Sequence, residues 1–289
     1  MRLDVGSCVD GCIVEVAAGG TVLLGMVKGY EHPEGGVVIE PYRLGGRRLG
    51  RPTRGTGGVI PLSAEWTPCM PRPVYTVSAS QVIRVVDPER ALRQAWRSLP
   101  ARVRLLIDAV DYEWAGLTGS WAVGLEGEYS DVDILLYGPE AYESIAEAHE
   151  RLGWEPCGSP RRGRGVGGEL GVLYRLKLVE LCSGSLRVTL RLLRATEGKP
   201  CSKRRVPLGL YKGHVEIVDI GESYLVPARY RAETPSGRTM VLETWRTRYQ
   251  ELPPGLYRVE GEVWVEDGEM FLSPDVRGFI TPAAWLHDS

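Results

Sequence analysis

The sequence predicts an α+β fold in which a mixed sheet with helices lies between two small β-rich, barrel-like domains. Three patterns lead to this prediction. Short apolar runs separated by glycines fill residues 1–85, capping signals and helical periodicity mark residues 86–204, and alternating strands with tight turns fill residues 205–289. A chain of 289 residues is long enough for these three domains.

The N-terminal region has the pattern of short strands. Residues 12–17, 21–27 and 36–40 are rich in β-branched side chains and are bounded by Gly or Pro. Residues 75–78 and 82–86 have the same character and are expected to close the sheet. We therefore expect a small barrel or an open sandwich here.

Helical signals follow. Asp87 can cap a helix with Pro88 in its first position, and apolar side chains recur at helical spacing as far as Leu99. A second helix is predicted at residues 101–110 and a third at residues 139–152. Helices on either side of the central motif favour a mixed α/β arrangement for this part of the chain.

Alternation with period two returns in the second half of the chain. Residues 174–181 and 186–193 alternate and are joined by a Gly-containing turn, which predicts a hairpin. Residues 257–265 and 269–272 predict another hairpin around an Asp-Gly turn. The C-terminal region is therefore expected to form a second small barrel that resembles an OB-fold.

The most informative stretch lies between the second and third predicted helices. Gly119 and Ser120 form a turn that can hold a phosphate, and Asp131 and Asp133 follow in a predicted strand. Side chains of a strand alternate between its faces, so the two carboxylates share one face while Val132 enters the core. Like charges so close together are kept most easily with cations between them, and Mg²⁺ prefers such oxygen ligands. The alternative is an acidic turn at the end of a β-strand.

Residues 117–138 resemble the signature of the DNA polymerase beta superfamily of nucleotidyltransferases. In that signature an apolar residue, Gly, and Gly or Ser precede a spacer and an acid-apolar-acid-apolar strand; Thr118 is an inexact match to its first position. The chain is also similar to an uncharacterised archaeal group of predicted nucleotidyltransferases, through residues 29–36 and 224–230. The resemblance implies a polymerase-beta-like core for residues 86–204, and the wider similarity implies no particular substrate.

The resemblance also implies a chemistry. Members of the superfamily transfer a nucleoside monophosphate from an NTP to an acceptor, with Mg²⁺ or Mn²⁺. Asp131 and Asp133 would be the catalytic metal ligands, and the amides around Gly119 and Ser120, with the Ser120 hydroxyl, would hold the triphosphate.

A third carboxylate on a neighbouring strand is also part of the superfamily pattern. Thr189 stands where that acid would be expected, so Glu180 on the preceding strand is the nearest candidate, and Glu197 is another. Alternatively, Glu180 is a solvent-facing strand residue opposite Lys177 or Arg191. Both interpretations remain open from the sequence.

A cluster of arginines provides a candidate nucleotide-binding loop. Arg161, Arg162 and Arg164 lie in a Gly-rich segment that can close over a triphosphate or contact an acceptor backbone. The alternative is a solvated surface loop.

Composition limits the other functions. The net charge of −2 argues against a generally basic nucleic-acid-binding protein, and the absence of a long apolar run or a leader predicts a cytoplasmic protein without a membrane partner. The six cysteines form no Cys-x-x-Cys pair, which disfavours zinc; buried thiols are expected unless the source is a hyperthermophile, where disulfides become plausible. Asn is absent and Arg outnumbers Lys, as in thermophiles or GC-rich genomes.

The sequence as a whole predicts a metal-dependent nucleotidyltransferase that acts on RNA or protein. The alternative is a weakly active or inactive protein that keeps the core and serves as a nucleic-acid-binding or regulatory module. The missing third acid is the observation that motivates this alternative.

Overall fold

The computed structural model describes residues 7–44, 47–48, 62–70, 72–128, 130–158, 173–201 and 205–284. The chain divides into two compact units, each built from three segments. The N-terminal unit comprises Met1–Arg104, Tyr112–Gly138 and Ala195–Ser202, and the C-terminal unit comprises Leu105–Asp111, Pro139–Arg194 and Lys203–Ser289. The predicted boundaries after residues 85 and 204 stay predictions.

The predicted α+β class is wrong, because the protein is mostly β. Strands make up 48% of the described residues and helices 17%, with four α-helices among these residues. The predicted helices do form, but they are short, at eight residues for α1 (Pro88–Ala95) and α2 (Ala101–Asp108) and eleven for α4 (Ala141–Arg151). Strands extend much further, up to the seventeen residues of β15 (Val206–Glu222).

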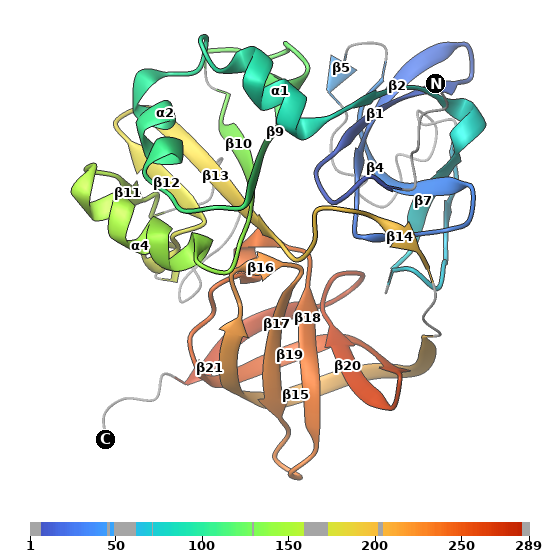
Figure 1. The fold of residues 1–289 in the computed structure, drawn as a ribbon. Helices are drawn as coiled ribbons and strands as arrows, with labels where there is room; N and C mark the ends of the chain where they lie inside the picture. Colours follow the sequence, from blue (N-terminus) through green and yellow to red (C-terminus); the bar gives the residue numbers. More distant parts are fainter. Residues whose placement is uncertain are drawn as a thin grey trace. The chain divides into compact units, whose positions relative to one another are not determined.

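The N-terminal unit begins with an antiparallel sheet (Figure 1). Its strands are β1 (Ile13–Ala18), β2 (Thr21–Val27), β4 (Gly36–Leu44), β5 (Arg47–Arg48), β6 (Ala64–Glu65), β7 (Val74–Ser78) and β8 (Val82–Val86). They pair in the order β6-β7-β4-β2-β1-β8, with β5 added to β4. Apolar side chains from its strands, such as Val16, Leu23, Val37 and Val77, are buried, which explains why this region has short apolar runs.

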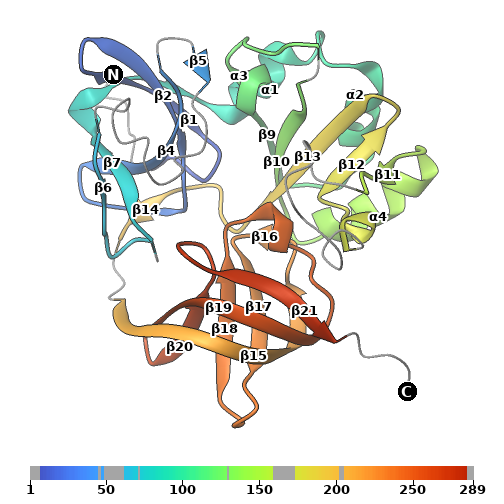
Figure 2. The same ribbon diagram turned by 180° about the vertical axis from the view of Figure 1, so that it is seen from behind.

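The same unit contains the hairpin that carries the central motif. It consists of β9 (Trp114–Thr118), the single-turn helix α3 (Gly119–Ala122) and β10 (Val132–Tyr137). Helix α1 lies beside β9 and α3 (Figure 2). The predicted cap is confirmed, since Asp87 Oδ1 accepts a hydrogen bond of 2.7 Å from the Arg90 amide. Gly116 lets α1 approach β9, because a Cβ atom there would lie 2.6 Å from Pro88 Cβ.

A short strap of chain also belongs to the N-terminal unit. Within it, β14 (Lys199–Pro200) pairs in parallel with β3 (Glu31–His32). The Lys199 amide donates to the Tyr30 carbonyl at 2.8 Å, and the Cys201 amide donates to the His32 carbonyl at 2.8 Å. Residues 195–202 therefore return to the N-terminal sheet, although the chain on either side belongs to the other unit.

In the C-terminal unit, α4 precedes several strands. They belong to a six-stranded sheet, and the strands of it that lie in this unit are β11 (Glu155–Pro156), β12 (Glu180–Ser183), β13 (Leu186–Leu193) and β16 (Leu225–Val226), with a 3₁₀ turn at Tyr174–Leu176. The predicted hairpin is confirmed as β12 and β13, which pair in antiparallel register with Glu180 opposite Thr189. Its first strand is shorter than predicted.

The rest of the C-terminal unit is a closed barrel (Figure 1). It is formed by β15, β17 (Ala228–Glu233), β18 (Thr239–Thr244), β20 (Glu269–Ser273) and β19 (Gly255–Glu266), and β21 (Phe279–Ala284) adds to β19. β15 pairs with both β17 and β19, which closes the ring, and β18 runs parallel to β20. The barrel encloses a continuous apolar core that includes Tyr230, Leu242, Val259 and Leu272. None of the helices in the described part of the chain has the length and apolar character needed to span a bilayer.

Candidate active site

The central turn is shaped around a glycine. Gly119 directly follows β9 and has a φ of 69°, which a residue with a side chain rarely adopts. A Cβ atom at this position would overlap with Asp133 Oδ2. The Asp133 carboxylate therefore lies directly against the backbone of the turn. Position 119 favours glycine, because glycine adopts this φ and has no side chain.

The two aspartates are held by β10. Asp133 stands opposite Thr118 in the β9–β10 register, one residue before Gly119. Val132 between the aspartates is 2% exposed, whereas Asp131 and Asp133 are half-buried. Asp133 lies on β10 and Asp131 directly precedes that strand, so the shared face of the two carboxylates stays a prediction from strand alternation.

Helix α3 supplies main-chain donors beside the carboxylates. It is only four residues long, so all of its amides belong to the first turn of a helix and have no acceptor within it. Ser120 is buried, and its carbonyl accepts from the amides of Val123 at 3.3 Å and Leu125 at 2.9 Å. A single turn has little macrodipole, so an anion here would be held by the N–H groups themselves.

Residues near the N-terminus contact the β9–β10 hairpin. The Thr118 hydroxyl donates to the Gly11 carbonyl. Gly11 packs against β10, since a Cβ atom there would lie 2.7 Å from Leu135 Cδ2. The neighbouring Asp10 is fully buried and accepts from the Gly29 amide at 3.1 Å. The sequence analysis missed these residues, although an Asp-Gly pair between two cysteines is a turn signal.

The loop that leads to the aspartates is anchored at two points. Arg43 Nη2 donates to the Leu125 carbonyl at 3.3 Å. Further on, the Gly127 amide donates to Ser130 Oγ at 2.8 Å, and the Ser130 amide donates to the Gly127 carbonyl at 2.9 Å. Ser130 therefore closes a tight turn one residue before Asp131.

Residues 29–36 carry part of the wider resemblance. Among them, His32 has a structural role. The ring is 1% exposed, with Nε2 2.8 Å from the Cys8 carbonyl and Nδ1 accepting from the Val38 amide at 3.4 Å. Burial lowers the pKa of His32, which favours a neutral ring that donates from Nε2. Both ring nitrogens are used by the fold.

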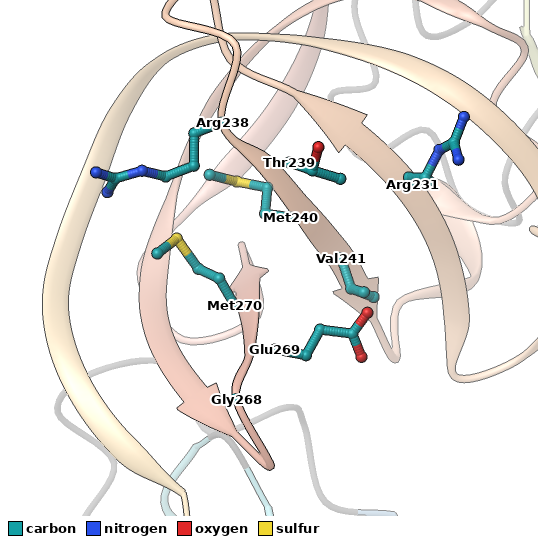
Figure 3. Close-up of a pocket in the computed structure, with 8 residues that line it drawn as sticks. All are labelled: Arg231, Arg238, Thr239, Met240, Val241, Gly268, Glu269 and Met270. Carbon is teal, nitrogen blue, oxygen red and sulfur yellow. The ribbon is translucent and has the colours of Figure 1, made fainter.

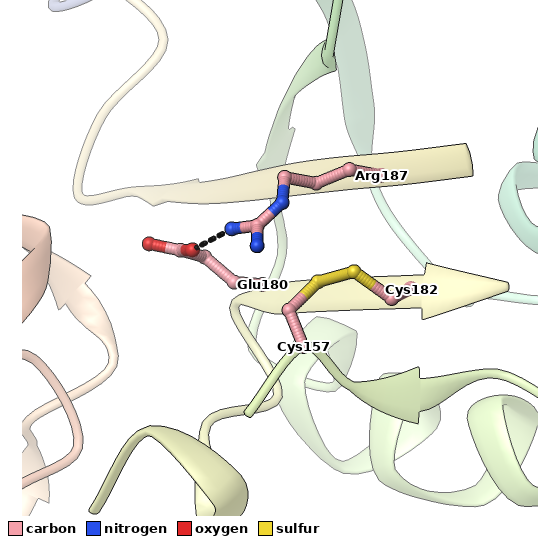
Figure 4. The surroundings of a disulfide bond; sticks show 4 residues. All are labelled: Cys157, Glu180, Cys182 and Arg187. Carbon is pink, nitrogen blue, oxygen red and sulfur yellow. Dashed lines mark hydrogen bonds and ion pairs between the residues drawn. A yellow bond between two sulfur atoms is a disulfide. The ribbon is translucent and has the colours of Figure 1, made fainter. Parts of the chain in front are cut away.

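Glu180, the candidate third acid, lies on β12 in the C-terminal unit, whereas the glycine turn and both aspartates belong to the N-terminal unit. Its carboxylate accepts a hydrogen bond of 2.7 Å from Arg187 Nη1 on β13 (Figure 4). Burial raises the pKa of Glu180, while Arg187 and Lys177 act in the opposite direction. The partner is neither Lys177 nor Arg191 as the solvent-facing alternative supposed, and Glu180 is largely buried.

A disulfide bond lies beside this ion pair, whereas the other four cysteines are thiols. Cys157 and Cys182 are bonded, with their Cα atoms 4.9 Å apart (Figure 4). The bond ties β12 to the segment after β11, and it closes a loop of 25 residues. The pairing of cysteines so far apart in the sequence has no local signal.

The remaining site predictions are less well defined by the structure. Arg161, Arg162 and Arg164 lie outside the described residues. Glu197 is exposed in the strap of residues 195–202. Within the described ranges, no three His, Cys, Asp or Glu side chains are grouped so that they could hold a metal ion. Among these described side chains, Asp131 and Asp133 therefore have no third such group beside them.

A separate pocket of about 570 Å³ lies at the edge of the C-terminal barrel (Figure 3). Arg238, Met240 and Met270 extend to the same side, and Arg231 lies on the neighbouring strand. Glu269 also lines it and offsets part of the positive charge. The pocket has no aromatic side chain on which a base could stack, so its lining does not identify a ligand.

Comparisons of this chain with protein families, with curated proteins and with solved structures found no match.

Proposed function

We propose that this chain is a metal-dependent nucleotidyltransferase that moves a nucleoside monophosphate from an NTP to an RNA or protein acceptor in the cytoplasm. The observation that carries the proposal is the close approach of the Asp133 carboxylate to Gly119, with the half-buried Asp131 directly before the same strand. This arrangement brings main-chain donors for a polyphosphate next to two carboxylates. Assignment to the polymerase beta superfamily remains part of the proposal and rests on the motif residues.

The donor set fits a hard divalent cation. Two half-buried carboxylates close together in the sequence offer oxygen ligands, and Mg²⁺ or Mn²⁺ commonly completes its coordination with water and substrate phosphates. Such a cation would neutralise charge on the phosphoryl group and activate the acceptor oxygen. Asp131 and Asp133 would hold it, and the missing third carboxylate would have to be supplied from elsewhere.

The chain's own residues would act mainly by positioning. The amides of α3 and the Ser120 hydroxyl would orient the triphosphate, because Gly119 allows its backbone to approach the phosphate closely. Val132 and Ile134 are buried and would fix the positions of both carboxylates. The C-terminal barrel has the five-stranded architecture that often binds oligonucleotides, which favours an extended acceptor by analogy of fold alone.

The test is metal-dependent NTP binding followed by transfer of labelled nucleotide to total cellular RNA and protein. We expect Asp131→Asn and Asp133→Asn each to reduce transfer by about 100-fold or more with little loss of folding stability, because both side chains are partly exposed. Glu126→Gln is the matched control, since Glu126 is an exposed acid in the preceding loop. A loss of folding equal to the loss of transfer would make the aspartates structural.

Glu180 needs its own comparison. If it is the third acid, Glu180→Gln abolishes transfer while Arg187→Met leaves much of it. If Glu180 only holds the hairpin, both variants lose stability and both keep transfer, because each removes one partner of a largely buried ion pair.

The second candidate function is a binding or regulatory module without catalysis. The ion pair that engages Glu180 favours it, because no third acid is grouped with the aspartates among the residues that the structure describes. NTP binding without transfer, under several metals and all four nucleotides, would support this function.

A further inference from the structure

The six cysteines of the chain occur in three spatial pairs. One pair is the Cys157–Cys182 disulfide. The side chains of Cys8 and Cys12 are neighbours, and so are those of Cys69 and Cys201. Thus every cysteine thiol in the described structure either is bonded to another or lies against one.

The two thiol pairs differ in exposure. Cys8 and Cys12 are 4% and 5% exposed, so no reagent can approach either sulfur without local opening. Cys69 is 2% exposed, but its partner Cys201 is only half-buried. Cys201 is therefore the one thiol in these pairs that a dissolved oxidant can reach in the folded protein.

Cys201 also lies in a segment that only a few described contacts attach to the N-terminal sheet. It lies near the end of the strap of residues 195–202, by which the chain returns from residues 139–194 to the N-terminal unit. The strap is held there by the two-residue strand β14, a few main-chain hydrogen bonds and an ion pair of 3.6 Å between Lys199 and Glu31. Cys69 lies in a turn after β6, so a bond between the two cysteines would join segments 132 residues apart in the sequence (201 − 69).

We propose that Cys69 and Cys201 are a redox modification site, at which a disulfide forms and makes the attachment of the strap to the N-terminal unit covalent. The oxidant is a low-molecular-weight disulfide of the glutathione type. Cys201 gives up its proton and attacks that disulfide, which forms a mixed disulfide and releases one thiol. Cys69 then gives up its proton and attacks the Cys201 sulfur, which completes the protein disulfide and releases the second thiol. Two electrons pass from the protein to the reagent.

The surroundings of Cys69 set the order of these steps. Burial, with the neighbouring Cys201, raises the pKa of the Cys69 thiol to about 12. Cys69 is thus a poor first nucleophile, and the exchange starts at the more exposed sulfur. The second step is favoured by proximity, since the two side chains are already neighbours.

The experiment treats the full chain, reduced and then freed of reductant, with glutathione disulfide. Non-reducing peptide mapping by mass spectrometry should find the Cys69 peptide linked to the Cys201 peptide, while Cys8 and Cys12 stay alkylatable only after unfolding. Cys69→Ser should stop the reaction at a stable mixed disulfide on Cys201, and Cys201→Ser should leave Cys69 as a thiol. Cys8→Ser is the matched control and should still form the link.

Thermal unfolding gives a second measurement. Oxidation should raise the unfolding temperature of the wild type by roughly 5–10 °C more than that of Cys201→Ser, which retains Cys157 and Cys182. A wild type that accumulates the mixed disulfide, that does not react at Cys201, or that links Cys201 to another cysteine would overturn the proposal. None of these outcomes depends on nucleotidyl transfer.

Discussion

At the scale of single residues, Gly119 links backbone conformation to the position of a carboxylate. Its positive φ disfavours any other residue, and its missing Cβ makes the room that Asp133 occupies. The neighbouring atom is the end of a short side chain, which can rotate away. A larger residue at 119 would therefore displace the Asp133 carboxylate more than it would disrupt the hairpin.

We expect Gly119→Ala to lower the free energy of unfolding by roughly 1–2 kcal/mol, mainly through the left-handed φ, and to abolish metal-dependent NTP binding. Urea unfolding and calorimetric titration measure the two effects. Gly124→Ala is the matched control, because Gly124 also has a positive φ, of 65°, and its surroundings leave open space for a Cβ. In the Asp133→Ala background the cost of Gly119→Ala should fall; an unchanged cost would show that the two residues do not interact.

At the scale of elements, a buried lysine joins the segment before β12 to the 3₁₀ turn Thr247–Tyr249. Lys177 is fully buried, and Nζ donates to the carbonyls of Thr247 at 2.8 Å and Gln250 at 2.6 Å. Glu251, two residues after this turn, adds to these contacts. Its carboxylate accepts hydrogen bonds from the amides of Leu178 and Val179 at 3.0 and 3.2 Å. These polar contacts fix the barrel to the segment before β12 in the same unit.

Lys177 makes the free energy of unfolding depend on pH. Burial lowers the pKa of Lys177 from 10.5 to about 8. Between these two values the unfolded chain binds a proton that the folded chain does not, so the free energy of unfolding rises with pH in this window. Below about pH 8 both states are protonated, and the contribution is constant and unfavourable.

We expect the stability of the wild type relative to Lys177→Met to increase by roughly 2–3 kcal/mol between about pH 7 and about pH 10. Urea unfolding of both proteins at a series of pH values measures this difference. Buried tyrosines such as Tyr142 and Tyr230, whose pKa is raised by burial, lower stability at high pH in both proteins and cancel. A difference that does not change with pH would mean that the two carbonyl acceptors keep the ammonium group charged.

At the scale of the whole molecule, the compact units do not follow the order of the chain. The C-terminal unit takes residues from both sides of the predicted boundary at 204, and Leu173 contributes to the core of the barrel. Nearly all other members of that core come from residues 215–280. The barrel therefore has a core of its own, whereas residues 139–194 depend on it.

We expect residues 205–289 to fold alone and residues 1–204 not to reach the native state. Without the barrel, Lys177 loses both carbonyl acceptors, and the amides of Leu178 and Val179 lose the Glu251 carboxylate. Near-ultraviolet circular dichroism and amide hydrogen exchange of the two fragments test this. Native-like protection of residues 173–194 in the fragment 1–204 would contradict it.

The sequence by itself determined the local features. Asp87 and Pro88 start a helix and the β12–β13 hairpin forms around its Gly turn, because each pattern depends on residues a few positions apart. The class was wrong because helical periodicity indicates where a helix lies but not how much of the chain joins sheets. The length of β15 is set by pairing with β17 and β19, which are distant in the sequence.

Only the tertiary structure decided which distant groups meet. Thr118 finds its acceptor 107 residues away at Gly11, Cys157 bonds to Cys182, and Glu180 is engaged by Arg187 on the facing strand. Such partners are chosen by the packing of buried surfaces and by the need of each buried polar group for a hydrogen bond. Neither requirement leaves a pattern in the neighbouring sequence, so the pair of aspartates could be predicted and the groups that support or complete their site could not.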